Sequence, residues 1–170
     1  ATVPEEFGLA NPSYVNGIFY QQGTGFKYFP VGDNGTFGPV YLEDVRGIDP
    51  EVGIRMVEPN PGTPRPGFEL LGISQLRYWQ LDVRNGTYDS SIVTVDLLGE
   101  DTTTIAQQNP LDVQTRAIAI SQSDSSDGEF NSIGNAEVAD DFITSEIGLT
   151  MPFFAIALAP TVPEGGLIFL

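Results

Sequence analysis

The sequence predicts an all-β protein, an antiparallel β-sandwich, immunoglobulin-like or jelly-roll-like, with about nine to eleven short strands and extended ends. Apolar residues recur mainly with a period of two, in short runs, which is the pattern of half-buried strands. Gly, Pro, Asn and Asp interrupt these runs about every 8 to 12 residues, a spacing typical of sandwiches. No stretch of ordinary helix length shows a convincing helical period.

The alternation is clearest in residues 75–83, where Trp79, Leu81 and Val83 point one way. Gln80 and Asp82 point the other way. The same pattern predicts strands around residues 40–42, 52–56 and 93–97. Two later runs, 116–120 and 153–158, alternate large with small apolar residues. We expect these two to be central strands covered on both faces, because they have no polar side.

The residue types between the apolar runs predict how the strands are connected. Two aromatic-rich runs, 14–20 and 26–31, are joined by residues 21–25 and predict a hairpin. Tight turns are expected at Asn34-Gly35, Asn85-Gly86 and Asp127-Gly128, where positive φ costs little.

Two segments are harder to assign. Residues 59–67 are rich in proline, so we expect a stiff crossing loop that joins no ladder and links the two sheets. Residues 135–143 predict either a short helix capped by Asn135 or a loop that leads into a strand.

The predicted organisation is one sandwich domain, residues 14–160, between an extended N-terminal arm, residues 1–13, and an apolar C-terminal strand or linker, residues 161–170. An arm or tail of this kind can add a strand to the sheet of a neighbouring subunit. The alternative is that each end pairs within its own domain.

Composition excludes several function classes. The chain has no Cys and no His, which removes thiolate chemistry, the commonest general base and the commonest zinc ligand. Lys and Arg number 7 against 23 Asp and Glu, for a formal net charge of −16, so nucleic acid and anionic membrane would be repelled. No apolar run approaches the roughly 20 residues that span a bilayer, and we expect a protein that is not membrane-embedded.

The acidic loop 123–129 is the candidate metal site. Asp124, Asp127 and Glu129 offer hard oxygen ligands on a flexible loop, which suits calcium. The alternative is a solvated hairpin turn made by Asp127-Gly128, with no cofactor.

Two further sets of side chains are candidates for a catalytic or a sugar-binding site. Paired carboxylates can hydrolyse glycosides without His, and Glu43, Asp44 and Glu58 are the candidates. Nothing in the sequence brings two of them together, so we expect no enzyme and no catalytic residue. An exposed row of aromatic side chains could stack on sugar rings and bind carbohydrate. The alternative is that strand alternation turns half of these side chains into the core. The aromatic candidates are Tyr14, Phe19, Tyr20, Phe26, Tyr28, Phe29 and Phe37. Trp79 is expected in the core.

Six short motifs occur in order along the chain: Phe-Pro-Val-Gly-Asp (29–33), Gly-Pro-Val-Tyr-Leu (38–42), Arg-Tyr-Trp-Gln-Leu (77–81), Ala-Ile-Ala-Ile (117–120), Gly-Glu-Phe (128–130) and Ser-Ile-Gly (132–134). Over residues 26–160 they resemble β-sandwich modules of surface and adhesin proteins exported by the type IX secretion system of Bacteroidota. Gly38 stands where such modules commonly carry Arg. The resemblance implies a secreted protein, extracellular or at the cell surface, and supplies no catalytic residues.

Two functions are therefore expected. The first is a secreted structural or adhesive building block of a bacterial appendage, filament or adhesin, whose partners are its own copies or neighbouring domains, joined by strand pairing. The second is a calcium-assisted carbohydrate-binding module with a glycan partner. Assembly without ligand would favour the first, and a monomer stabilised by calcium or glycan would favour the second.

Overall fold

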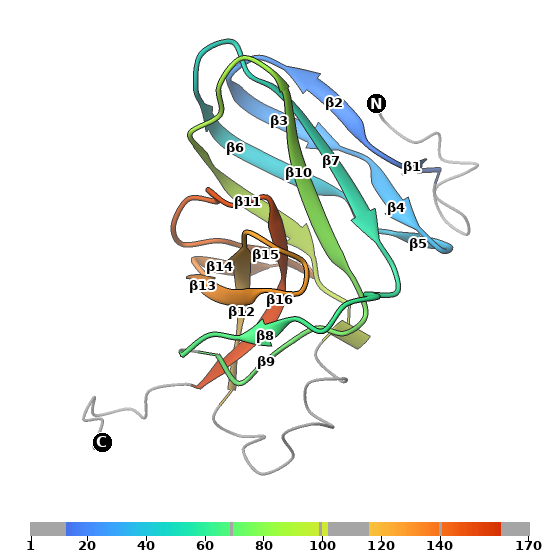
Figure 1. The fold of residues 1–170 in the computed structure, drawn as a ribbon, viewed down its shortest axis with the longest axis vertical. Coiled ribbons are helices and arrows are strands. Elements are labelled where there is room, and N and C mark those ends of the chain that lie inside the picture. The colour runs from blue at the N-terminus through green and yellow to red at the C-terminus, as the bar shows by residue number, and fades with distance from the viewer. Residues whose placement is uncertain (1–12, 69, 99, 102–115, 140, 161–170) are drawn as a thin grey trace.

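A computed structural model describes residues 13–68, 70–98, 100–101, 116–139 and 141–160, and it confirms the all-β, sandwich-like fold (Figure 1). The described residues form sixteen strands in three sheets. This exceeds the expected nine to eleven because seven of the strands have only two or three residues, too few to leave a periodic apolar pattern. Among the described residues, no helix is long and apolar enough to cross a membrane.

One layer is a five-stranded antiparallel sheet. Its strands, in spatial order, are β14 (Glu137–Ala139), β15 (Phe142–Thr144), β11 (Ser90–Asp96), β6 (Val40–Arg46) and β3 (Gly25–Phe29).

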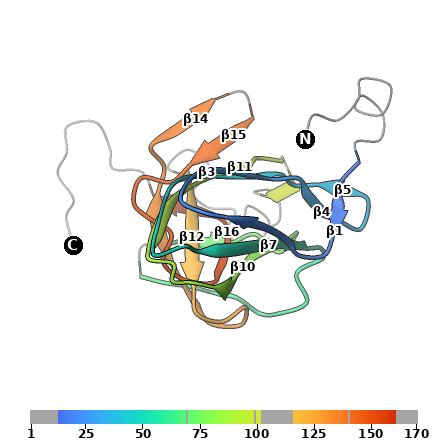
Figure 2. The same cartoon turned by 90° about the horizontal axis from the view of Figure 1, so that it is seen from above.

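The facing layer is an eight-stranded sheet. Its path runs through β2 (Phe19–Gln22), β7 (Glu51–Val57), β10 (Tyr78–Asn85), β16 (Phe153–Pro160), β12 (Arg116–Ser123), β13 (Glu129–Gly134) and β8 (Arg65–Pro66), and β9 (Gly72–Ile73) pairs with β16. Figure 2 shows the two layers edge-on, with β3 and β11 in one and β7 and β10 in the other.

A small third sheet lies at one end and contains β1 (Val15–Asn16), β4 (Val31–Asp33) and β5 (Thr36–Phe37). The β4–β5 turn is the predicted one: Asn34 and Gly35 have φ of 52° and 81°, as a tight hairpin turn requires.

The main core lies between the two large sheets. The five-stranded sheet contributes Leu42 and Val93, and the eight-stranded sheet contributes Ile54, Trp79 and Phe154, all fully buried. Trp79 is in the core, as expected, stacked on Phe154 with ring centroids 5.7 Å apart. Each sheet therefore buries one face of its alternating strands, the arrangement expected of a sandwich.

β16 confirms the prediction of a strand covered on both faces. Phe154 and Ile156 belong to the main core, whereas Ala155 and Ala157 belong to a second cluster with Leu70, which also includes Ile73, Tyr78 and Phe130. The second cluster lies on the outer side of the eight-stranded sheet, under the connection between β7 and β10. This cover explains why residues 153–158 carry no polar side.

The expected hairpin between residues 14–20 and 26–31 is wrong. β2 pairs with β7, and β3 pairs with β6 in the other sheet, so residues 23 and 24 cross between layers. Phe19 and Phe29 then face each other across the core with ring centroids 6.3 Å apart. The two rings can pack against each other in the core because β2 and β3 lie in opposite sheets. In a hairpin the two strands would instead be neighbours in one sheet.

The expectation for residues 59–67 is also wrong. β8 pairs in parallel with β13, and the segment stays with the eight-stranded sheet instead of linking the two sheets. Arg65 and Gly67 donate their amides to the carbonyls of Gly128 and Phe130. Pro66 lies between these two donors and needs no N–H of its own, so a proline is tolerated at this sheet edge.

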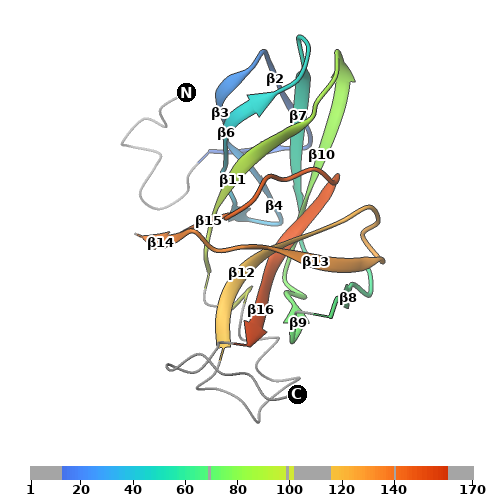
Figure 3. The ribbon, with the colours of Figure 1, turned by 90° about the vertical axis from the view of Figure 1, so that its left-hand side faces the viewer.

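Residues 135–143 contain no helix in their described part. They contain β14 and the start of β15, an antiparallel pair in which Val138 lies opposite Ile143. Figure 3 shows this hairpin projecting beyond the layer. The expected tail, residues 161–170, and the arm, residues 1–13 apart from residue 13, lie outside the described residues.

Candidate functional site

The outer face of the five-stranded sheet carries a continuous cross-strand row. Tyr28 pairs with Tyr41, Tyr41 with Thr94, Thr94 with Thr144, and Thr144 with Glu137. Directly paired residues share a face of a sheet, and the neighbours of Tyr41 and Thr94 along their strands, together with Phe29 and Ile143, are buried in the core. All five side chains therefore project away from the core, one from each strand.

Tyr41 on β6 is the centre of an aromatic cluster. Its ring centroid lies 4.9 Å from that of Tyr28, 5.9 Å from that of Phe26 and 5.9 Å from that of Phe142. The ring of Phe26 is tilted by 37° and that of Phe142 by 74°. Phe26 is 58% exposed, so the cluster presents apolar surface to solvent.

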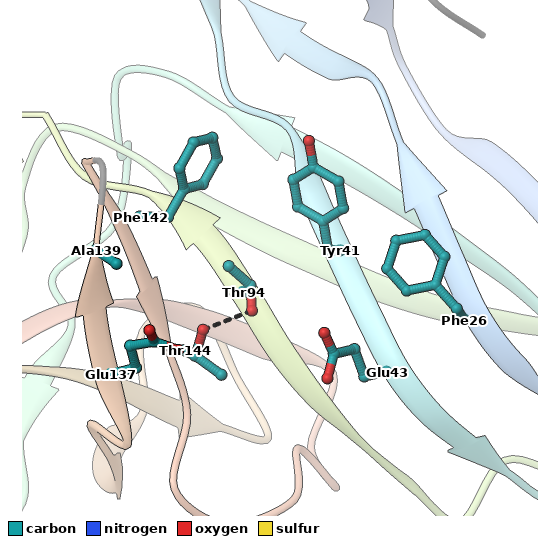
Figure 4. Close-up of a pocket in the computed structure, with 8 residues that line it drawn as sticks. All are labelled: Phe26, Tyr41, Glu43, Thr94, Glu137, Ala139, Phe142 and Thr144. Carbon is teal, nitrogen blue, oxygen red and sulfur yellow. Dashed lines mark hydrogen bonds between the residues drawn. The ribbon is translucent and has the colours of Figure 1, made fainter.

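Beside these rings the face is hollowed into an open depression of about 330 Å³ (Figure 4). Phe26, Tyr41 and Phe142 supply its aromatic part. Its polar part consists of two carboxylates and two hydroxyls, and the complete lining is Phe26, Tyr41, Glu43, Thr94, Glu137, Ala139, Phe142 and Thr144. Thr94 and Thr144 lie between the two carboxylates, with their hydroxyl oxygens 2.8 Å apart in a hydrogen bond.

The electrostatic character of the depression is acidic. Its charged lining residues are Glu43 and Glu137, both exposed. Lys27, a neighbour on β3, has its amino group near Gly23, toward the turn that follows β2. Desolvation, and to a lesser degree Tyr41, raises the pKa of Tyr28, so its hydroxyl stays neutral at physiological pH.

Such a surface can stack against a ligand and accept hydrogen bonds from it. Aromatic rings offer flat apolar contact with polar edges, and carboxylates and hydroxyls accept hydrogen bonds from a ligand. The combination suits a ligand that has apolar C–H faces and a rim of hydroxyl or amino donors.

The calcium candidates lie elsewhere. Asp124, Asp127 and Glu129 line a second open depression, of about 460 Å³, at the β12–β13 loop, together with Arg65, Ser125, Gly128, Asn131 and Met151. Asp127 Oδ1 accepts the amide of Thr63 at 2.8 Å. In the described part of the chain, no three Asp or Glu side chains lie close enough together to hold a metal ion.

The three carboxylates considered for catalysis are separated. Glu43 lines the aromatic depression, Asp44 has φ of 55° and pairs with Arg46 at 2.7 Å, and Glu58 follows β7 in the other sheet. Glu137, which the sequence does not single out, is the carboxylate that shares a depression with Glu43.

The aromatic candidates divide between surface and interior. Phe26 and Tyr28 belong to the outer cluster, whereas Phe19 and Phe29 pack in the core. The Tyr14 hydroxyl accepts a hydrogen bond from the amide of Gly35 at 2.9 Å, and the Tyr20 hydroxyl donates one to Asp82 at 2.6 Å. Phe37 lies half-buried in β5.

Five residues of this face were not predicted from the sequence: Tyr41, Thr94, Glu137, Phe142 and Thr144. The available signal was that Tyr41 and Thr94 are the outward positions of alternating runs.

No protein-family model matches the chain, and searches of curated proteins and of solved structures gave no match.

Proposed function

We propose that the protein is a secreted adhesive module that binds a glycan chain on the outer face of its five-stranded sheet. The observation that supports this most is the contact of Tyr41 with three other aromatic rings on an exposed sheet face. Clustered apolar surface at a solvent-facing site marks an interaction surface. Carboxylates and hydroxyls beside the rings supply the hydrogen-bond acceptors that a sugar requires.

Binding without cleavage is the expected activity. Glycoside hydrolysis needs two carboxyl groups placed on either side of the scissile bond. Glu43 and Glu137 instead project from one open face of one sheet, on β6 and β14. Calcium is not required by this proposal, because the acidic loop residues line a different depression.

The experiment is a binding screen of the purified protein against soluble polysaccharides, followed by calorimetry with Tyr41→Ala. The variant should lose about tenfold or more in affinity, because truncating a central aromatic anchor commonly costs more than 1 kcal/mol. Phe68→Ala is the matched control, since Phe68 is 97% exposed and lies in the connection between β7 and β10, away from the depression. Failure of every glycan to bind, or equal affinity of the Tyr41→Ala variant, would refute the proposal.

A second candidate is a structural subunit joined to its neighbours by strand pairing. Within the described residues, β14 and β3 are the end strands of the five-stranded sheet. Val138 of β14 shares the inner side of the sheet with Ile143 but is 48% exposed, whereas Ile143 is fully buried. A strand or apolar side chain from another copy could cover it. Electron microscopy of the secreted protein, with Val138→Lys as the variant that should block filaments, tests this candidate.

A further inference from the structure

We infer that the glycan bound on this face is an amino-sugar chain, made of hexosamine units with free, protonated amines and without acidic groups. The inference rests on the proposed function and specifies the ligand class of the same site. It follows from the charge of the depression, from the separation of its two carboxylates and from the tilt of its rings.

The two carboxylates are far apart. Glu43 is on β6 and Glu137 on β14, and β11 and β15 lie between these strands. Adjacent strands are spaced by about 4.8 Å, so the two backbones are separated by roughly 14 Å. In Figure 4 the two side chains lie on opposite sides of the Thr94–Thr144 pair. A single cation is too small to contact both, so the carboxylates are two separate acidic points along an extended ligand.

The sign of the charge selects the ligand. A uronate or sulfated sugar would approach two carboxylates on a protein of net charge −16, and like charges at an interface disfavour binding. A protonated amine is attracted to Glu43 or Glu137 and is also stabilised over an aromatic face. Charge complementarity therefore favours a cationic sugar over a neutral one and excludes an acidic one.

The geometry of the rings selects a single chain. Phe26 and Phe142 are tilted by 37° and 74° against Tyr41, so the three rings form no common plane. A flat crystalline polysaccharide surface needs coplanar rings, whereas one soluble chain can twist to follow tilted ones. The centroid spacings of 5.9 Å are close to the length of one sugar unit in an extended chain, which lets successive units meet successive rings.

The test measures calorimetric affinity for four soluble hexamers at mildly acidic pH: glucosamine, N-acetylglucosamine, glucose and galacturonate. Glucosamine hexamer should bind most tightly and galacturonate hexamer should not bind. Raising the salt concentration from low values to about 0.15 M should weaken the binding of glucosamine hexamer and leave glucose hexamer unaffected, because salt screens exposed charges.

Two isosteric variants locate the effect. Glu43→Gln and Glu137→Gln should each weaken glucosamine hexamer binding by about two- to fivefold, the range of an exposed ion pair. Each should weaken glucose hexamer binding less, because Gln removes the charge but keeps an oxygen acceptor. Glu129→Gln is the control, since it makes the same change in net charge at the other depression and should have little effect.

The outcomes separate the two claims. Glucose hexamer binding as tightly as glucosamine hexamer, with no effect of Glu43→Gln, would overturn the amino-sugar assignment while leaving the glycan-binding proposal intact. Absence of binding by all four hexamers, together with failure of the wider polysaccharide screen, would overturn both. Oligolysine binding as tightly as glucosamine hexamer, with the same losses in the Gln variants, would assign the face to a basic peptide and also overturn the inference.

Discussion

Arg77 and Asp101 form an ion pair in which neither side chain is exposed, with Arg77 Nη2 2.8 Å from Asp101 Oδ2. The guanidinium also lies 4.5 Å from the ring centre of Trp79 and 3.0 Å from the carboxylate of Asp96, at the end of β11. Arg77 immediately precedes β10 in the eight-stranded sheet. It therefore connects the two layers of the sandwich at one end through charge as well as packing.

Breaking this pair from one side should be costly. Arg77→Met leaves Asp101 buried without its cation, and the free energy of unfolding should fall by about 3–5 kcal/mol. Urea unfolding followed by tryptophan fluorescence measures the loss. The matched control is Arg46→Met, which breaks the exposed pair with Asp44 and should cost far less, because solvent screens an exposed ion pair. Equal losses in the two variants would contradict the role assigned to Arg77.

Asp96 should make stability fall as pH rises from about 4 to 6. Burial raises the pKa of Asp96 from 3.8 to about 6, because the attraction to Arg77 only partly offsets the loss of hydration and the Asp101 carboxylate lies nearby. In this window the folded state binds more protons than the unfolded state, so the free energy of unfolding decreases with rising pH. Asp96→Asn should remove the decrease, whereas Asp89→Asn, an exposed control, should keep it.

Glu51 should make the free energy of unfolding rise with pH, in a lower pH range than that of Asp96. Hydrogen bonds from Arg84 and Asn85 lower its pKa from 4.5 to about 2, so its contribution to stability is present above pH 4.5 and is lost as pH falls toward 2. Chemical denaturation across this range should therefore show Glu51→Gln losing less stability on acidification than the unmodified protein. An identical acid limb in the variant would count against this assignment.

Gly38 should not tolerate a side chain. A Cβ there would collide with Met56 Sδ and lie 2.7 Å from Arg77 Nη1, and neither side chain can move into solvent because both are buried. Gly38→Ala should lower the free energy of unfolding by about 1–3 kcal/mol. In a Met56→Ala background the same change should cost less, and simple additivity in that double-mutant cycle would show that no collision occurs.

Asp127 should support the loop structurally, not through calcium. Asp127→Ala frees the amide of Thr63 and should lower the free energy of unfolding by about 0.5–1.5 kcal/mol. Asp127→Asn keeps an oxygen acceptor and should cost less. Adding calcium or a chelator to the unmodified protein should leave the melting temperature unchanged, and a rise with calcium would instead identify a metal site.

Local patterning predicted the strands well. The alternation in residues 75–83 and 93–97 placed Trp79, Val93 and Val95 in the core, and Asn34-Gly35 predicted its turn, because side-chain direction in a strand and positive φ in a turn are local properties. The glycine at position 38 has a tertiary cause, since Met56 and Arg77 occupy the space that a side chain would need.

The sequence by itself determined that this is an acidic β-sandwich without His or Cys, and that the strand at residues 153–158 is covered on both faces. Only the tertiary structure decided that residues 14–31 cross between sheets, that Pro66 joins an edge, and that Glu137 shares a depression with Glu43. Strand partners are chosen by long-range burial and register. A site assembled across five strands is consequently not encoded in any one segment of the chain.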